Sequence, residues 1–376
     1  MYQGDKMKQK NNYKNRSSNF EILRIIAMIM IVAHHFSVHG GFEMYISSLQ
    51  LNTIFLQFLQ FGGKIGVNIF VLISGYFLIN TDNIKVKKII KLWFQIFFYS
   101  SIIYLVFTLF GHQNFKVISC IKALLPIIYN KYWFASSYFI LYLFVPYINR
   151  FVKNIDKIAY KKLLILMFVL WTIIPTITKQ TMYMNALLWF LFLYLLAGYI
   201  RLHFDDSKKT CKQYFTRTII VYILTFAITI IIDVLCLKWP YFNKYTTYLY
   251  GMNQLPTLII SVFLFLTFKK LQMKNIKIIN VIASATFGVY LIHDNPLTRA
   301  FLWKTLFKNA TYQYSSLLIP YSILCILLVY VCSTIIELLR INLLEKNLLK
   351  GYDKFENKFV SLKNRFFSKL GILKDS

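Results

Sequence analysis

Apolar segments long enough, or nearly long enough, to cross a membrane recur along the whole chain, and no long polar segment separates them. A helix needs about 20 predominantly apolar residues to span the hydrocarbon core of a bilayer. Ten candidate spans are centred near residues 22–38, 62–79, 89–111, 132–149, 163–178, 186–200, 218–237, 255–268, 278–293 and 316–339. These segments predict an all-α fold: a polytopic integral membrane protein of about ten transmembrane helices.

The composition agrees with this fold class. Of the 376 residues, 57% are hydrophobic and only 15% are charged, whereas roughly a quarter of the residues in a soluble domain are charged. Five cysteines form no CxxC pair and lie mostly in apolar segments: Cys120, Cys211, Cys236, Cys325 and Cys332. An odd number of cysteines in such positions argues against a disulfide framework.

The chain is strongly basic, with 43 Lys and Arg residues, 14 Asp and Glu residues and a net charge of +29. In a soluble protein this balance would suggest nucleic acid as a partner. Here most of the cations lie in short segments between apolar ones, which excludes a nucleic-acid groove and indicates contacts with anionic membrane lipids. Because the cations concentrate in alternate segments, both termini are expected to face the cytoplasm.

Three regions are expected along the chain: a basic cytoplasmic leader at 1–19, a membrane domain at 20–340 and a basic cytoplasmic tail at 341–376. The first apolar segment is interpreted as a retained helix, because no small-residue cleavage site follows it. In the tail, apolar residues recur every three to four positions among Lys and Arg. This spacing is typical of a basic amphipathic helix on a membrane surface, with a disordered tail as the alternative.

The first apolar segment carries Glu21, Arg24, His34, His35 and His39. Each ionisable group costs on the order of 3 kcal/mol or more within a bilayer, so this helix must face protein or water. Arg24 and His35 return to within about 20° of the same helix face, roughly 16 Å apart, whereas His34 points about 80° away. We therefore predict one internal cavity, with Arg24 toward the cytoplasm and His35 toward the outside.

These two side chains suit different chemistry: a guanidinium binds phosphate or carboxylate, and an imidazole exchanges protons near neutral pH. Two alternatives remain at this point. Arg24 and Glu21 would form an ion pair at the inner interface, with the histidines at the outer one. Otherwise His35 and His39, four residues apart, would hold a metal ion. Six histidines do not supply the boxes of a membrane di-iron oxygenase, and no metal is expected.

Four segments carry a resemblance to a known family. They are the first span with its Arg24-to-His35 spacing, GVNIFVLISGYF at 66–77, YWFASSYFILYLFVPYINRF at 132–151 and TFGVYLIHDNP at 286–296. In this order they resemble the landmarks of the integral-membrane acyltransferase family three, bacterial enzymes that mostly O-acetylate surface polysaccharides and related glycans. The resemblance runs from about residue 16 to 340. The sequence departs from the commoner pattern at Asn68, where many members have an acidic residue.

The resemblance implies acyl-CoA, with acetyl-CoA expected, as a co-substrate from the cytoplasm and no permanently bound cofactor. An Arg-x-x-Arg pair of the commoner pattern is missing after the second span, and the nearest substitutes are Lys85, Lys87 and Lys88. With Arg24, these lysines would form a cationic inner mouth for the phosphate-rich head of CoA. Ser74 and Tyr76 lie in the half of the second span along which the pantetheine arm would pass.

The resemblance further implies a glycan hydroxyl as acceptor, met at the outer side of a bacterial plasma membrane. His35 is the expected base for that hydroxyl. Asn68 would orient His35 if the first two helices pack together. Side chains expected at the outer end, which could bind the acceptor or form an ordinary interfacial belt, are Trp133, Tyr290, His293 and Asp294.

Three structural interpretations complete the predictions. The glycines of the second landmark region are typical of close helix packing in lipid. Asp233 and Glu337 are expected near the membrane interfaces. A secondary transporter or flippase for a sugar-linked or lipid-linked anion is the alternative function, with Arg24 binding substrate and His35 relaying protons. A lipid-binding scaffold without enzymatic activity is the third possibility.

Overall fold

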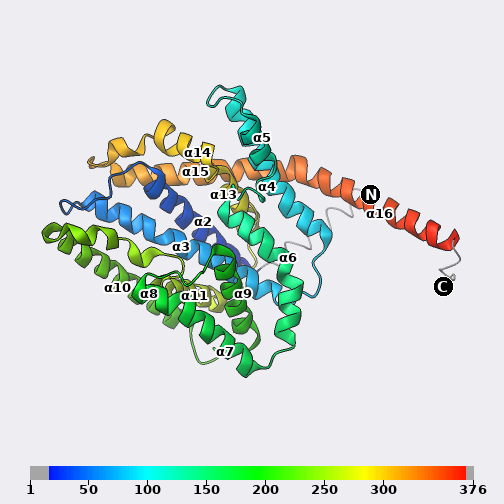
Figure 1. Ribbon diagram of the computed structural model, residues 1–376, viewed down its shortest axis with the longest axis horizontal. Coiled ribbons are helices and arrows are strands. Elements are labelled where there is room, and N and C mark those ends of the chain that lie inside the picture. Colours follow the sequence, from blue (N-terminus) through cyan, green and yellow to red (C-terminus); the bar gives the residue numbers. More distant parts are fainter. Residues whose placement is uncertain (1–16, 370–376) are drawn as a thin grey trace.

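A computed structural model describes residues 17–369. In this part of the chain all regular structure is helical and no strand occurs. Figure 1 shows long helices side by side in a bundle, with the last helix, α16, projecting beyond it. The all-α polytopic fold class predicted from the sequence is confirmed.

Each predicted span coincides with a helix or a helix pair. These elements are α2 (Ser18–His39), α3 (Leu51–Leu78), α4 (Val86–Leu109), α6 (Trp133–Lys153), α7 (Lys157–Phe168) continuing to α8 (Ile174–Thr178), α9 (Ala186–Leu202), α10 (Cys211–Lys238), α11 (Leu255–Lys270), α12 (Lys277–Ser284) with α13 (Thr286–His293), and α15 (Leu318–Arg340). Seven helical stretches among the described residues have the length and hydropathy of a span, and the stretches Ala186–Leu202 and Lys277–His293 are apolar but shorter. The number of ten spans and the cytoplasmic position of the termini stay predictions.

Short helices connect these elements. They are α5 (Val117–Leu124) and α14 (Pro296–Ala300). The tail helix α16 (Lys346–Lys369) is long, and a π-helical turn at Ile341–Glu345 joins it to α15. A helix in the tail agrees with the apolar spacing of its sequence, and its place on a membrane surface stays a prediction. Residues 1–16, which hold most of the expected basic leader, lie outside the described residues, as do residues 370–376.

Helix α3 begins at Leu51, well before the predicted start of the second span near residue 62. Hydropathy does not reveal this extension, because the added residues include polar ones such as Gln57. In the structure Gln57 is buried and donates a hydrogen bond of 3.0 Å to the Asp233 Oδ1 atom on α10. A polar side chain is tolerated here because a partner on another helix satisfies it.

Glycines allow α3 to approach its neighbours closely. A Cβ atom on Gly63 would lie 2.2 Å from Cγ of His34, and one on Gly66 would lie 2.5 Å from the Ala27 carbonyl oxygen. The packing interpretation of these glycines is confirmed. Besides α3, helix α2 contacts α11, α12, α13 and α15, so its ionisable side chains face protein rather than lipid.

Asp233 and Glu337 are both fully buried in the protein, and their expected depth near the membrane interfaces stays a prediction. Glu337 on α15 accepts hydrogen bonds from Gln95 at 2.8 Å and Tyr99 at 2.6 Å, both on α4. It also pairs with Arg340 at 2.8 Å. A buried carboxylate needs partners of this kind, and they join α4 to α15 beside α13.

Candidate active site

Two buried histidines meet where α2 lies against the end of α13. Nδ1 of His35 is 2.9 Å from Nε2 of His293, and Nδ1 of His293 is 2.6 Å from the carbonyl oxygen of Val289. A carbonyl oxygen only accepts, so Nδ1 of His293 carries the proton and Nε2 of the neutral ring is an acceptor. Nδ1 of His35 must then donate to it. In the neutral pair, Nε2 of His35 therefore keeps its lone pair and can accept a proton.

His35 lines a narrow cavity whose water-accessible volume is about 20 Å³. The other lining side chains are largely apolar or aromatic, and they include the predicted Trp133 and Tyr290. They are Met28, Ile31, His34, Gly63, Lys64, Val67, Phe70, Trp133, Phe134, Phe287 and Tyr290. An imidazole that exchanges protons thus borders a space from which most water is excluded.

Lys64 is a cavity residue that the sequence did not single out. It lies on α3, and its Nζ atom is 4.7 Å from the centre of the Trp133 ring. A cation over an indole face is a favourable contact. The sequence signal was a lysine among glycines within an apolar segment, and its proximity to His35 depends on how α2 and α3 pack.

His34 also lines the cavity, so the expectation that it points away from the site is wrong. Its Nδ1 atom is 2.7 Å from the carbonyl oxygen of Gln60 on α3 and therefore carries the proton. The angle between His34 and His35 around α2 does not by itself predict which of them lines the cavity. Helix α3 approaches α2 closely at Gly63, and the cavity between them borders both rings.

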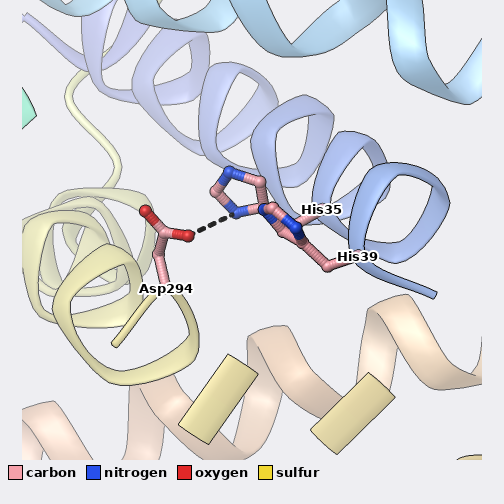
Figure 2. A group of neighbouring side chains, drawn as sticks. All are labelled: His35, His39 and Asp294. Atoms are coloured by element: carbon pink, nitrogen blue, oxygen red, sulfur yellow. Dashed lines mark ion pairs between the residues drawn. The ribbon is translucent and has the colours of Figure 1, made fainter. Parts of the chain in front are cut away.

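Asp294, directly after α13, faces the two histidines His35 and His39 of α2, as Figure 2 shows. Its Oδ1 atom is 3.6 Å from Nδ1 of His35 and 3.1 Å from Nη1 of Arg299. The same Nη1 atom lies 3.4 Å from Nε2 of His39. A carboxylate beside His35 stabilises positive charge on the imidazole. Sequence reasoning missed Arg299, which lies in the short helix α14.

The same group bears on the metal alternative. Ligand atoms of His35, His39 and Asp294 lie within 4.8 Å of one another, close enough to be drawn around one ion. However, the Arg299 guanidinium already contacts both Asp294 and His39. A divalent cation here would meet a fixed positive charge, so this donor set does not favour a metal.

Nearer the start of α2, Nη1 of Arg24 donates to Oε1 of Glu21 at 2.9 Å, and the Arg24 side chain is 27% exposed. The ion pair of the alternative interpretation is thus present. One carboxylate contact leaves further guanidinium donors, so the pair does not exclude anion binding at Arg24.

Ser74 lies between the cavity residue Phe70 and the C-terminal end of α3. Its hydroxyl donates to the Phe70 carbonyl oxygen at 2.9 Å and accepts from the Tyr138 hydroxyl at 3.1 Å. Tyr138 stacks at 6.0 Å on Phe134 and at 6.3 Å on Tyr142 along α6. Because Phe134 lines the cavity, this aromatic row extends from the cavity along α6 past Ser74.

Tyr76 and the three lysines after the second span do not line the His35 cavity. The Tyr76 hydroxyl accepts a hydrogen bond of 2.8 Å from Arg201, which joins α3 to α9. Lys87 pairs with Asp353 of α16 at 2.5 Å, whereas Lys85 and Lys88 are exposed. The structure therefore brings Lys87 to the tail helix, and the cationic mouth around Arg24 stays a prediction.

Asn68 does not orient His35, which corrects the prediction made for it. It is fully buried, and its amide nitrogen donates to the Met252 carbonyl oxygen at 2.8 Å and to Ser261 at 3.4 Å. Its amide oxygen accepts a hydrogen bond of 2.9 Å from Trp189. Asn68 thus connects α3 with α9 and α11, and His293 occupies the position next to His35.

The comparisons with known proteins identify the family of the chain. A family model described as an acyltransferase domain matches residues 17–338, which include His35, His293, Asp294 and Lys64. No curated protein and no solved structure matches the chain. Since the matched region covers most of the sequence, the chain belongs to acyltransferase family three.

Proposed function

We propose that this membrane acyltransferase moves an acyl group, acetyl in the expected case, from cytoplasmic acyl-CoA to a hydroxyl of a cell-surface or cell-wall glycan. The expected location is a bacterial plasma membrane. The observation that carries the proposal is the His35–His293 hydrogen bond of 2.9 Å. It leaves the basic nitrogen of His35 available beside a narrow cavity that a cationic side chain, Lys64, also lines.

The proposed reaction uses His35 twice. Nε2 of His35 takes the proton of the acceptor hydroxyl as its oxygen attacks the thioester carbonyl carbon. The carbonyl oxygen becomes an anion, for which Lys64 is the nearest cationic donor. The carbon–sulfur bond then breaks, and the CoA thiolate takes the proton from His35. Acyl-CoA and an alcohol thus give an ester and free CoA, and His35 returns to its neutral state.

His293 and Asp294 are positioning residues in this scheme. His293 fixes which nitrogen of His35 carries the proton, and Asp294, 3.6 Å from Nδ1 of His35, stabilises the imidazolium that forms. The same division of labour between a base and the groups that orient it occurs in hydrolase triads.

The donor would approach along the cytoplasmic half of α3. Arg24 offers guanidinium donors for the anionic head of CoA, and Lys85 and Lys88 are exposed cations in the segment after the end of α3. The aromatic row on α6, from Tyr142 to Phe134, would flank the pantetheine arm on its way to His35. This arrangement supports a donor that enters from the cytoplasm.

The decisive experiment compares the O-acyl content of surface glycan among a deletion strain, its wild-type complement and complements carrying His35→Ala or His34→Ala. Wild type should restore O-acylation and release free CoA in isolated membranes, whereas His35→Ala should do neither. His34→Ala should lose less, because the Asp294 carboxylate that stabilises a protonated imidazole lies 3.6 Å from His35. Substrate binding or movement without CoA release would instead indicate a transporter, and full O-acylation by His35→Ala would reject His35 as the base.

A further inference from the structure

Two adjoining cavities open at the end of the bundle where α7 begins and α9 ends. The first is lined by cationic and aromatic side chains, among them Lys157, Lys161, Lys162 and His203. The second is an apolar groove between α7, α9 and α11, lined by residues such as Leu196 and Val262. Both cavities share Lys161, Ile165 and Tyr199, so they form one continuous amphipathic site, which we call the α7–α9 groove.

The charges at the mouth of this groove are available to a ligand. Among residues 17–369, none of Lys157, Lys161 and Lys162 forms an ion pair within 4.0 Å, and all three are exposed. Other lysines near the same end are neutralised, for example Lys153 by Asp82 and Lys269 by Asp206. A cluster of unpaired cations favours an anionic ligand.

One carboxylate lies close to the mouth in sequence, that of Asp156. It is not among the residues that line either cavity. Its Oδ1 atom accepts hydrogen bonds from the backbone nitrogens of Ile158 at 2.7 Å and Ala159 at 2.9 Å, so it caps the first turn of α7. The mouth lining is therefore cationic and contains no acid.

We propose that the α7–α9 groove binds an anionic phospholipid of the inner leaflet. The phosphate would lie among Lys157, Lys161 and Lys162, and one acyl chain would lie in the groove beside Val262 and Leu196. Basic pockets between membrane helices on the cytoplasmic side suit such head groups. This site is separate from the His35 cavity and does not depend on the proposed transfer reaction.

The lining also distinguishes a phospholipid from acyl-CoA, which likewise has an anionic head. The pantetheine arm of CoA carries amides, and buried amides need hydrogen-bond partners. Below the mouth residues Lys161 and Tyr199, the side chains of the groove are aliphatic or aromatic hydrocarbons. Such a surface matches a fatty acyl chain and leaves pantetheine amides without partners.

The test measures lipid retention by native mass spectrometry of the purified full-length protein, after exchange into phosphatidylglycerol or phosphatidylcholine with identical acyl chains. Wild type should retain phosphatidylglycerol in preference. The triple variant K157Q/K161Q/K162Q should lose about fivefold affinity for phosphatidylglycerol per lysine, with phosphatidylcholine unaffected. A matched control is K208Q/K209Q/K212Q, which removes the same charge from exposed residues that do not line the groove. Equal losses in the two triple variants would overturn the proposal.

A second pair of variants tests the apolar part. Ile165→Trp fills the groove from an exposed position, and Ile223→Trp adds the same bulk to an exposed position on α10. Only the first should lower phosphatidylglycerol retention, with the unfolding temperature in detergent unchanged in both. Displacement of the lipid by soluble glycerophosphoglycerol would show that the head group alone binds, and displacement by acyl-CoA would assign the groove to the donor. Either result would overturn the proposal.

Discussion

If His293 acts only through His35, removing both histidines should cost no more activity than removing His35 alone. The change that tests this is His293→Leu, which deletes the acceptor of the 2.9 Å hydrogen bond and keeps a side chain of moderate size. Nδ1 of His35 would then be a buried donor without its partner. Leaving such a group unsatisfied costs about 1–3 kcal/mol.

That cost predicts the kinetic effect. Because about 1.4 kcal/mol corresponds to tenfold in rate, His293→Leu should lower transfer by about 5- to 150-fold. His35→Ala should lower it by about 10²- to 10⁴-fold, the usual contribution of a general base. The double variant should match His35→Ala, since residues that act as a unit are not additive.

The assay is acyl transfer from radiolabelled acetyl-CoA in membranes that contain equal amounts of each variant, with acyl-CoA binding measured separately. His293→Gln is the informative companion, because an amide oxygen can accept the proton of His35 and should recover part of the loss. Thermal unfolding in detergent controls for folding. Losses that multiply in the double variant would show that the two histidines act independently and would refute the orientation role of His293.

Three further predictions test other parts of the structure. Arg24→Lys keeps a charge and loses the forked donors, so acyl-CoA affinity should fall by about tenfold or more while the protein still inserts. An unchanged dissociation constant would mean that Arg24 only pairs with Glu21. Gly288→Ala should destabilise the fold by about 1–3 kcal/mol, because a Cβ atom would lie 2.4 Å from the carboxyl carbon of Glu337. Thermal unfolding in detergent measures this loss of stability, and the variant should unfold at a lower temperature. Chelators should leave transfer unchanged and His39→Ala should cost less than His35→Ala, unless a metal is bound.

The sequence predicts most of the helices because membrane spans are set by local hydropathy. Helix α2 occupies Ser18–His39, close to its predicted centre at 22–38. The predictions that fail depend on distant partners: α3 extends to Leu51 because Gln57 meets Asp233, and Asn68 is held by Trp189 rather than by His35. No local pattern specifies such partners, which lie on helices far along the chain.

The same distinction applies to the site. Ionisable residues in lipid are conspicuous in a sequence, which is why His35, His293 and Asp294 could be named from it. The direct contact between the two histidines could not be predicted, since 258 positions separate them along the chain. Arg299 was missed because it lies outside the apolar segments, where an arginine is unremarkable by composition, and the tertiary fold brings it to Asp294 and His39.

Burial of the His35–His293 pair has a chemical consequence. A thioester is also open to attack by water, so an acyltransferase must favour one hydroxyl over a solvent present in vast excess. His35 is only 8% exposed and His293 is fully buried, and the other side chains that line the cavity beside His35 are largely hydrophobic. Excluding water prevents such side reactions, and it also makes a buried imidazolium costly unless a carboxylate is near. Asp294 supplies this carboxylate, 3.6 Å from Nδ1 of His35. The proposed base can therefore be shielded from water before the reaction and still accept a proton during transfer.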